Sequence, residues 1–179
     1  MATKHPYFEK VIQFIGDIFG PVVNILCAVG LLKGVLTIGI TMHWLTTSNS
    51  TYQVLWLLSN VFFDFLPIFL AFTSAKVLKT NQFTAVLIAS FLVQPQLATM
   101  LKNHATLFGL TLPNTSYEST VLPIIFAVIL LHYVELGLQR CLPKLIQDMF
   151  VPLISLVVVL PITLFILGPV GNLLAKGVT

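Results

Sequence analysis

Five long apolar stretches, separated by short polar segments, account for most of the chain. A helix needs roughly 20 apolar residues to cross a bilayer. The stretches that meet this length cover about 11–40, 52–75, 83–101, 120–139 and 149–175. Each is continuously apolar, whereas the strands of a membrane barrel alternate over segments of about ten residues. The pattern therefore predicts an all-α integral membrane protein with about five transmembrane helices.

The basic residues predict how these spans are oriented. Most lie in segments that five spans would place on one side: Lys4, Lys10, Lys76, Lys79, Arg140 and Lys144. The segments of the other side hold Lys102 and Lys176, and Lys33 lies inside the first span. Because short cytoplasmic loops carry an excess of Lys and Arg, we expect the N-terminus inside and the C-terminus outside.

The composition agrees with a chain that lies in lipid. It is 57% hydrophobic and 8% charged, with a mean hydropathy of +0.98. Soluble domains carry roughly 25% charged residues, and disordered chains lack such apolar content. The net charge of +3 comes with no basic patch of interleaved aromatics, so we expect no nucleic-acid partner.

The sequence holds no recognisable soluble-type active site. It has no Walker-type glycine loop, no HExxH, no GxSxG and no pair of carboxylates at catalytic spacing. Cys27 and Cys141 have neither CxxC spacing nor a neighbouring histidine cluster, so we interpret them as packing residues. We therefore expect no catalytic residues, no metal and no cofactor.

Small residues in the first span predict a close helix contact. Gly16 and Gly20 are four residues apart, as are Gly30 and Gly34. Such pairs let two backbones approach closely in lipid. The alternative is the general tolerance of glycine in membrane helices.

Two polar residues lie within the second span. Asn60 and Asp64 are one turn apart on the same face. A charged side chain near the bilayer centre costs at least about 2.5–3.5 kcal/mol, so Asp64 should face protein, a cavity or a partner. It would either line a cavity or anchor the helix near Pro67, whose missing donor frees a carbonyl.

The fourth span carries a polar stripe, and the third contains a break. His132, Glu135 and Gln139 follow at helical spacing and could relay protons or bind a sugar hydroxyl. Anchoring at the inner interface is the plainer interpretation, which we favour. Gln94-Pro95-Gln96 interrupts the third span, either as a break healed by the two amides or beside a substrate path. The candidate substrate-binding residues are Asn60, Asp64, Gln94, His132 and Glu135.

Several motifs resemble one family of transporters. Gly16-Asp-Ile-Phe-Gly-Pro21 and Ala28-Val-Gly-Leu-Leu-Lys-Gly34 resemble the opening of the EIIC membrane domain of phosphotransferase permeases. The similarity is to the glucose superfamily, on the branch for β-glucosides, sucrose, trehalose and N-acetylmuramate. Further matching blocks lie in order at 61–76, 79–83, 117–125, 133–135, 150–153 and 167–171.

The resemblance implies the scaffold half of a bacterial sugar permease. Such a domain has about ten spans, of which the first five make the homodimer contact. The later half holds the sugar through a Gly-Ile-Thr-Glu-type motif and an essential histidine, and neither is found here. At Gln94 relatives often have histidine. The implied partners are the second half, the EIIB and EIIA domains, and the sugar of the complete system.

We therefore expect a multi-pass protein of the bacterial inner membrane that takes part in phosphoenolpyruvate-dependent uptake of a glucoside-type sugar and is incomplete alone. One alternative is a free-standing five-span protein for interaction or assembly, without transport activity. Another is a small proton-coupled carrier using His132 and Glu135, for which the polar content is thin.

Overall fold

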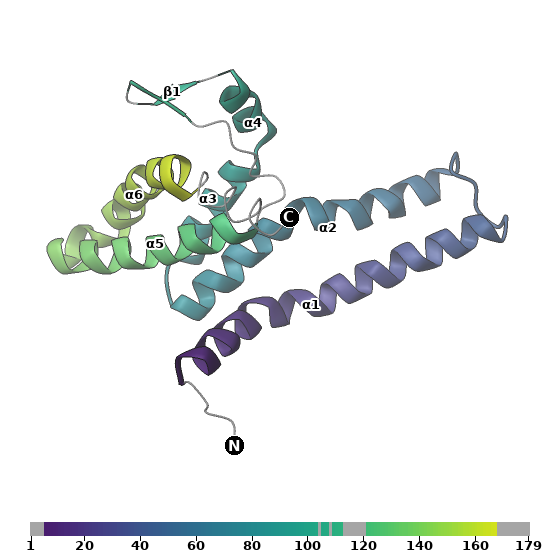
Figure 1. Ribbon diagram of the computed structural model, residues 1–179, viewed down its shortest axis with the longest axis horizontal. Coiled ribbons are helices and arrows are strands. Elements are labelled where there is room, and N and C mark those ends of the chain that lie inside the picture. Colours follow the sequence, from purple (N-terminus) through teal and green to yellow (C-terminus); the bar gives the residue numbers. More distant parts are fainter. Residues whose placement is uncertain (1–5, 104, 108, 113–120, 168–179) are drawn as a thin grey trace. The chain divides into compact units, whose positions relative to one another are not determined.

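The computed structural model describes residues 6–103, 105–107, 109–112 and 121–167 (Figure 1). They belong to two compact units, Met1–Leu66 and Pro67–Thr179. In the described part, four helices are long and apolar enough to span a membrane, or five if one bent pair counts as a single span. This confirms the prediction of an all-α membrane protein with about five spans.

The first unit is a helical hairpin of α1 (Pro6–Thr41) and the first part of α2 (Ser50–Leu78). After α1 the chain reverses through His43, whose φ is 61°. The backbone N–H groups of Trp44 and Leu45 then both donate to the carbonyl of Gly39, at 2.9 and 3.0 Å. A Cβ on Gly39 would lie 2.9 Å from Leu45 Cδ1, so glycine leaves room for the loop to fold back.

Lys33 is accommodated inside this hairpin by two aromatic rings. Its Nζ lies 5.2 Å from the ring centre of Trp56 and 4.7 Å from that of Phe63. A cation over an aromatic face is attracted by the ring quadrupole, more strongly where water is scarce. These contacts join α1 to α2, and they explain how an ammonium group can lie within an apolar helix.

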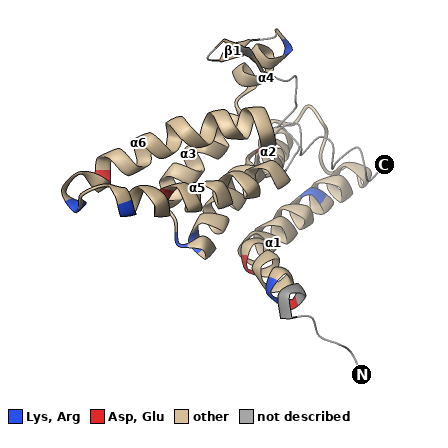
Figure 2. Cartoon of the chain, turned by 60° about the vertical axis from the view of Figure 1, so that its left-hand side comes forward, with Lys and Arg blue, Asp and Glu red and all other residues tan. Residues whose placement is uncertain are grey.

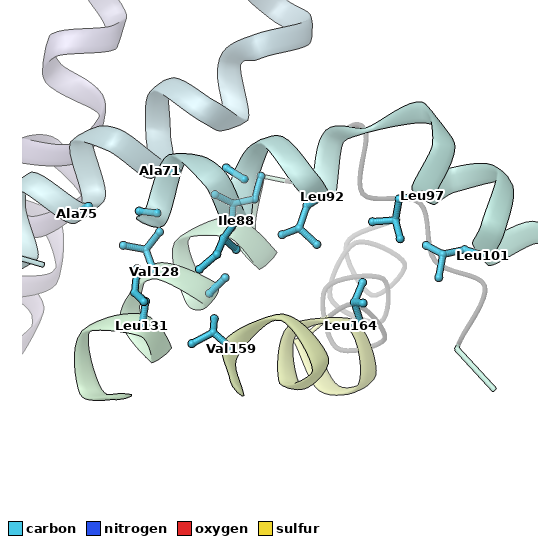
Figure 3. Packing of buried hydrophobic residues seen from close by; sticks show 14 of the residues in the cluster. Ala71, Ala75, Ile88, Leu92, Leu97, Leu101, Val128, Leu131, Val159 and Leu164 are labelled. Atoms are coloured by element: carbon cyan, nitrogen blue, oxygen red, sulfur yellow. The ribbon is translucent and has the colours of Figure 1, made fainter. Parts of the chain in front are cut away.

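The second unit packs the end of α2 with α3 (Gln82–Val93), α5 (Val121–Cys141) and α6 (Lys144–Ile162). Alanines of α2, α3 and α5 are fully buried and alternate with larger side chains such as Ile88 and Leu131 (Figure 3). Because alanine keeps helix axes close, this core is held by dense contacts rather than by bulky residues.

The third span is broken where the sequence predicts. α3 and α4 (Pro95–Lys102) form a pair bent by 51°, with Gln94 extended between them at φ −64° and ψ 125°. Proline disfavours the helical conformation of the preceding residue and is well placed as the first residue of a new helix.

The described hydrogen bonds at this break run between backbone groups, and the interpretation that the two glutamine amides heal it stays a prediction. The Gln94 N–H donates to the carbonyl of Phe91 at 3.2 Å, and the Gln94 carbonyl accepts from the N–H of Leu97 at 3.0 Å. Within the described residues, neither the Gln94 nor the Gln96 side chain takes part in these hydrogen bonds. The backbone groups left free at the break are paired with other backbone groups, because the last residues of α3 and the first residues of α4 supply the partners.

Two local features differ from the prediction. β1 (Thr106–Leu107) and β2 (Leu110–Thr111) form a short antiparallel hairpin, with Gly109 at φ 81°.

The last span begins at Lys144 instead of about 149. Its α-helical part ends at Ile162, after Pro161, and continues as a π-helical turn, η1 (Thr163–Leu167). The predicted remainder, 168–175, lies outside the described residues.

Candidate functional site

Glu135 is a buried carboxylate that connects two helical elements of the second unit. It lies on α5 with 5% of its surface exposed. Its Oε2 accepts hydrogen bonds from the Thr80 hydroxyl and from the Asn81 backbone N–H, the latter at 3.1 Å. Hydrogen bonds to an ionised acceptor are stronger than neutral ones. The carboxylate therefore fixes the turn between α2 and α3 against α5.

The backbone of this turn is shaped to present its donors. Lys79 has φ 56°, the left-handed conformation that ends many helices. The N–H of Thr80 donates back to the Ala75 carbonyl at 3.0 Å. The Asn81 side chain then caps α3 by accepting from the N–H groups of Phe83 and Thr84 at 3.0 and 3.2 Å, as N-cap residues do. The turn thus leaves the Thr80 hydroxyl and the Asn81 N–H free for Glu135.

Glu135 is one of the residues that line a small polar cleft. Its Oε1 is fully buried and has no hydrogen-bond partner among the described residues. The cleft has a volume of about 130 Å³ and is lined by Asn81, Glu135, Gln139, Gln147, Asp148, Val151 and Pro152. Because most of this lining is polar, the cleft is the strongest candidate for a binding site among the described residues of the second unit.

Gln147 of α6 is hydrogen-bonded to the end of α5 beside the cleft. Its Nε2 donates to the backbone carbonyls of Gln139 and Leu142, each at 2.7 Å. These bonds satisfy carbonyls at the end of α5 that have no partner within the helix. Gln147 also lines the cleft, and because its amide nitrogen is used in this way its side chain has only an acceptor left to offer.

The Glu135 contact places two basic turns of the second unit at the same end. Lys76 lies in the last turn of α2 and Lys79 just after it, whereas Arg140 lies in the last turn of α5 and Lys144 begins α6. Charged residues are otherwise sparse along the helices of this unit (Figure 2). This grouping agrees with the pattern from which the orientation was predicted.

The structure separates most of the predicted site residues. Glu135 and Gln139 of the polar stripe meet at the cleft, whereas the His132 ring packs edge-on against Tyr133 at 5.6 Å. Gln94 is exposed at the far end of α3. Within the described part of the chain no hydrogen bond joins His132 to Glu135, whose bonds run to Thr80 and Asn81, and the proton relay stays a prediction.

The remaining candidates lie on α2 within the first unit. Asn60 is half-buried and Asp64 is exposed. Asp64 forms no hydrogen bond within the described part of the chain, so neither a cavity-lining role nor an anchor near Pro67 is decided for it. Their place in a binding site stays a prediction.

Sequence reasoning missed Thr80, Asn81, Gln147 and Asp148 as cleft or contact residues. The signal for Asn81 is present, because an asparagine directly before an apolar helical segment is typical of an N-cap. Among the described residues no cluster of three metal-ligating side chains is found, and Cys27 and Cys141 are free and exposed.

Two glycines of α1, Gly30 and Gly34, border a second, apolar hollow. Gly16, Gly20, Gly30 and Gly34 are exposed, and a Cβ on any of them would meet nothing within 4 Å. A shallow groove of about 550 Å³ runs over one face, lined by Cys27, Gly30, Leu31, Gly34, Val35 and Ile38. The face is thus open to a neighbouring helix.

The sequence matches the profile of a known family, "Phosphotransferase system, EIIC", over residues 16–179. The chain belongs to the phosphotransferase system EIIC family. It is therefore a multi-pass membrane protein of the phosphotransferase system.

Individual relatives agree with this assignment. The chain is 35% identical to a β-glucoside-specific EIIBCA component of Dickeya chrysanthemi over 97% of its length, which is 28% of the relative. It is 28% identical to a sucrose-specific EIIBC component of Klebsiella pneumoniae over 99% of its length, 40% of the relative. The chain thus spans well under half of these relatives. No solved structure gives a significant match.

Proposed function

We propose that this chain is the scaffold part of an EIIC domain that takes part in phosphoenolpyruvate-dependent uptake of a glucoside-type sugar. The observation that carries the proposal is the family match over 16–179 combined with relatives named for β-glucosides and sucrose. The chain would lie in the bacterial inner membrane with its N-terminus and basic turns at the cytoplasmic face, where EIIB and EIIA domains act.

The volumes and linings of the hollows among the described residues support a sugar site that lies outside this chain. Pockets for small molecules measure roughly 300–1,000 Å³ and include several polar groups. The cleft beside Glu135 is polar but holds about 130 Å³. A larger hollow of about 390 Å³ between α3, α4 and α6 is lined mainly by apolar residues. We infer that the second half of the EIIC domain supplies the groups that bind the sugar.

Reassembly from two chains tests this proposal. Cells that lack their own β-glucoside permease would express this chain, a second-half EIIC chain from the β-glucoside-specific relative, or both, together with the EIIB and EIIA domains. We expect uptake of labelled β-glucoside only with both chains, and no measurable binding of β-glucoside or sucrose to this chain alone. Specific binding to this chain alone would contradict the assignment of the sugar site.

We further propose that the glycine face of α1 forms a homodimer contact. Replacing Gly30 and Gly34 together by leucine should weaken dimerisation in lipid vesicles by roughly tenfold or more, because the side chains would hold the backbones apart. The measurement is energy transfer between labelled copies as the protein-to-lipid ratio is varied. Gly137→Leu is the matched control, since this exposed glycine of α5 also has open space at its Cβ. Unchanged dimerisation in the double variant would place the contact elsewhere.

A further inference from the structure

Cations gather at one end of the second unit (Figure 2). Of the five lysines and arginines described in this unit, four lie in or next to the α2–α3 and α5–α6 turns: Lys76, Lys79, Arg140 and Lys144. All four side chains are exposed, and together we call them the basic rim. The fifth cation, Lys102, lies in the last turn of α4, at the other end of the bent pair that forms one span.

The carboxylates at this end do not neutralise the basic rim. Glu135 is buried, and its Oε2 is bound to the Thr80 hydroxyl and the Asn81 N–H. Asp148 is the one exposed carboxylate described in this unit. Four exposed cations therefore stand against one exposed carboxylate, and the rim attracts a negatively charged partner.

Large apolar side chains lie beside these cations and are almost fully exposed. Phe83 is 83% exposed, Leu145 98% and Met149 80%. Phe83 is the second residue of α3, four positions after Lys79, and Leu145 directly follows Lys144 at the start of α6. Apolar side chains next to lysine and arginine are typical of segments that lie at the boundary between lipid headgroups and acyl chains.

The length of α6 places this end at that boundary. Its 19 residues cover about 28 Å at 1.5 Å each, close to the roughly 30 Å thickness of the hydrocarbon core. When α6 spans the membrane, Lys144 at its first position lies at the level of the headgroups. Leu145 and Met149 then lie at the edge of the acyl chains.

We propose that the basic rim binds the headgroup of an anionic phospholipid, whose acyl chains lie against Phe83, Leu145 and Met149. Lysine and arginine near the membrane surface attract anionic lipids, and basic sites between spanning helices hold their headgroups. Arg140 can bind a phosphate through two parallel hydrogen bonds. The proposal does not depend on the sugar, and the proposed orientation decides only in which leaflet the lipid lies.

An acidic protein surface is the other partner that positive charge attracts. Such a surface would approach from the water and would contact the cations alone. Leu145 and Met149 belong to a spanning helix and face the side from which lipid approaches, so a soluble partner would leave them uncovered. A phospholipid covers both kinds of side chain at once, because it carries its charge and its apolar chains in one molecule.

Lipid binding to the purified 179-residue chain tests this proposal. The chain in detergent would be titrated with phosphatidylglycerol or with phosphatidylcholine of the same acyl chains, and native mass spectrometry would measure bound lipid. We expect tighter binding of phosphatidylglycerol. Lys144→Gln, and Lys79→Gln in the other turn, should each weaken it about fivefold without changing phosphatidylcholine binding. Lys102→Gln, an equal loss of charge at the other end, should leave both lipids unaffected.

A variant of the apolar contact separates a lipid from a protein partner. Leu145→Ser keeps every charge and should weaken the binding of both lipids by a similar factor, since it removes a contact with the acyl chains. Equal binding of the two lipids, equal effects of Lys144→Gln and Lys102→Gln, or unchanged binding in Leu145→Ser would each overturn the proposal. Displacement of bound phosphatidylglycerol by the EIIB or EIIA domain of the β-glucoside-specific relative would show that the rim is a protein interface and would overturn it too.

Discussion

Replacing Glu135 by alanine is expected to lower the free energy of unfolding of the second unit by about 3 kcal/mol. The change removes two hydrogen bonds to a carboxylate, each worth about 1.5–3 kcal/mol, and leaves the Thr80 hydroxyl without its acceptor. Relief of the buried charge offsets part of this loss. Amides of α3 and α5 that exchange through unfolding of this unit should then exchange roughly 150-fold faster, measured by hydrogen exchange and mass spectrometry.

Two variants at neighbouring positions calibrate this result. Thr80→Val removes one of the two bonds and should cost about 1.5 kcal/mol. Gln139→Ala changes an exposed side chain one turn from Glu135 and should stay within about 0.5 kcal/mol. Both tryptophans, Trp44 and Trp56, belong to the first unit, so their fluorescence reports whether that unit is unaffected. Exchange in Glu135→Ala that matches Gln139→Ala would show that the carboxylate does not hold the turn.

The spans were predictable because lipid imposes one dominant constraint. Every backbone polar group in the membrane must be paired internally, so a long apolar stretch has few alternatives to a helix. The break at Pro95 was predictable for a similarly local reason, since proline removes a donor and restricts the residue before it. The start of α6 was predicted less well, because Lys144 at its first position is polar and lies outside the apolar stretch from which the span was predicted.

The cleft was only partly predictable, since it depends on contacts between distant segments. The polar stripe drew attention to Glu135, but its partners Thr80 and Asn81 are 55 and 54 positions away along the chain. Nothing in the spacing of His132 and Glu135 shows that the carboxylate turns towards the α2–α3 turn instead of the histidine. Likewise, the sequence places Lys33 inside the first span but does not show that Trp56 and Phe63 of another helix lie beside it.

Replacing Ile88 by alanine should destabilise the second unit through a cavity in its core. Ile88 is 1% exposed and lies within the cluster formed by α2, α3, α5 and α6 (Figure 3). In soluble proteins this substitution costs about 2–5 kcal/mol. In lipid the transfer from water contributes little, because acyl chains are as apolar as the core. The loss of packing contacts remains, so we expect about 2–3 kcal/mol, measured by hydrogen exchange of α3 and α5.

Leu87 provides the matched control, since it is adjacent in sequence and 54% exposed. Leu87→Ala removes a similar volume from a surface that faces lipid or a partner, where no cavity forms, so a change under about 0.5 kcal/mol is expected. Ile88→Val should fall between the two, at about 1 kcal/mol, because it removes a single methylene. Equal effects of Ile88→Ala and Leu87→Ala would contradict a densely packed core, since only a buried side chain leaves a void that lipid cannot fill.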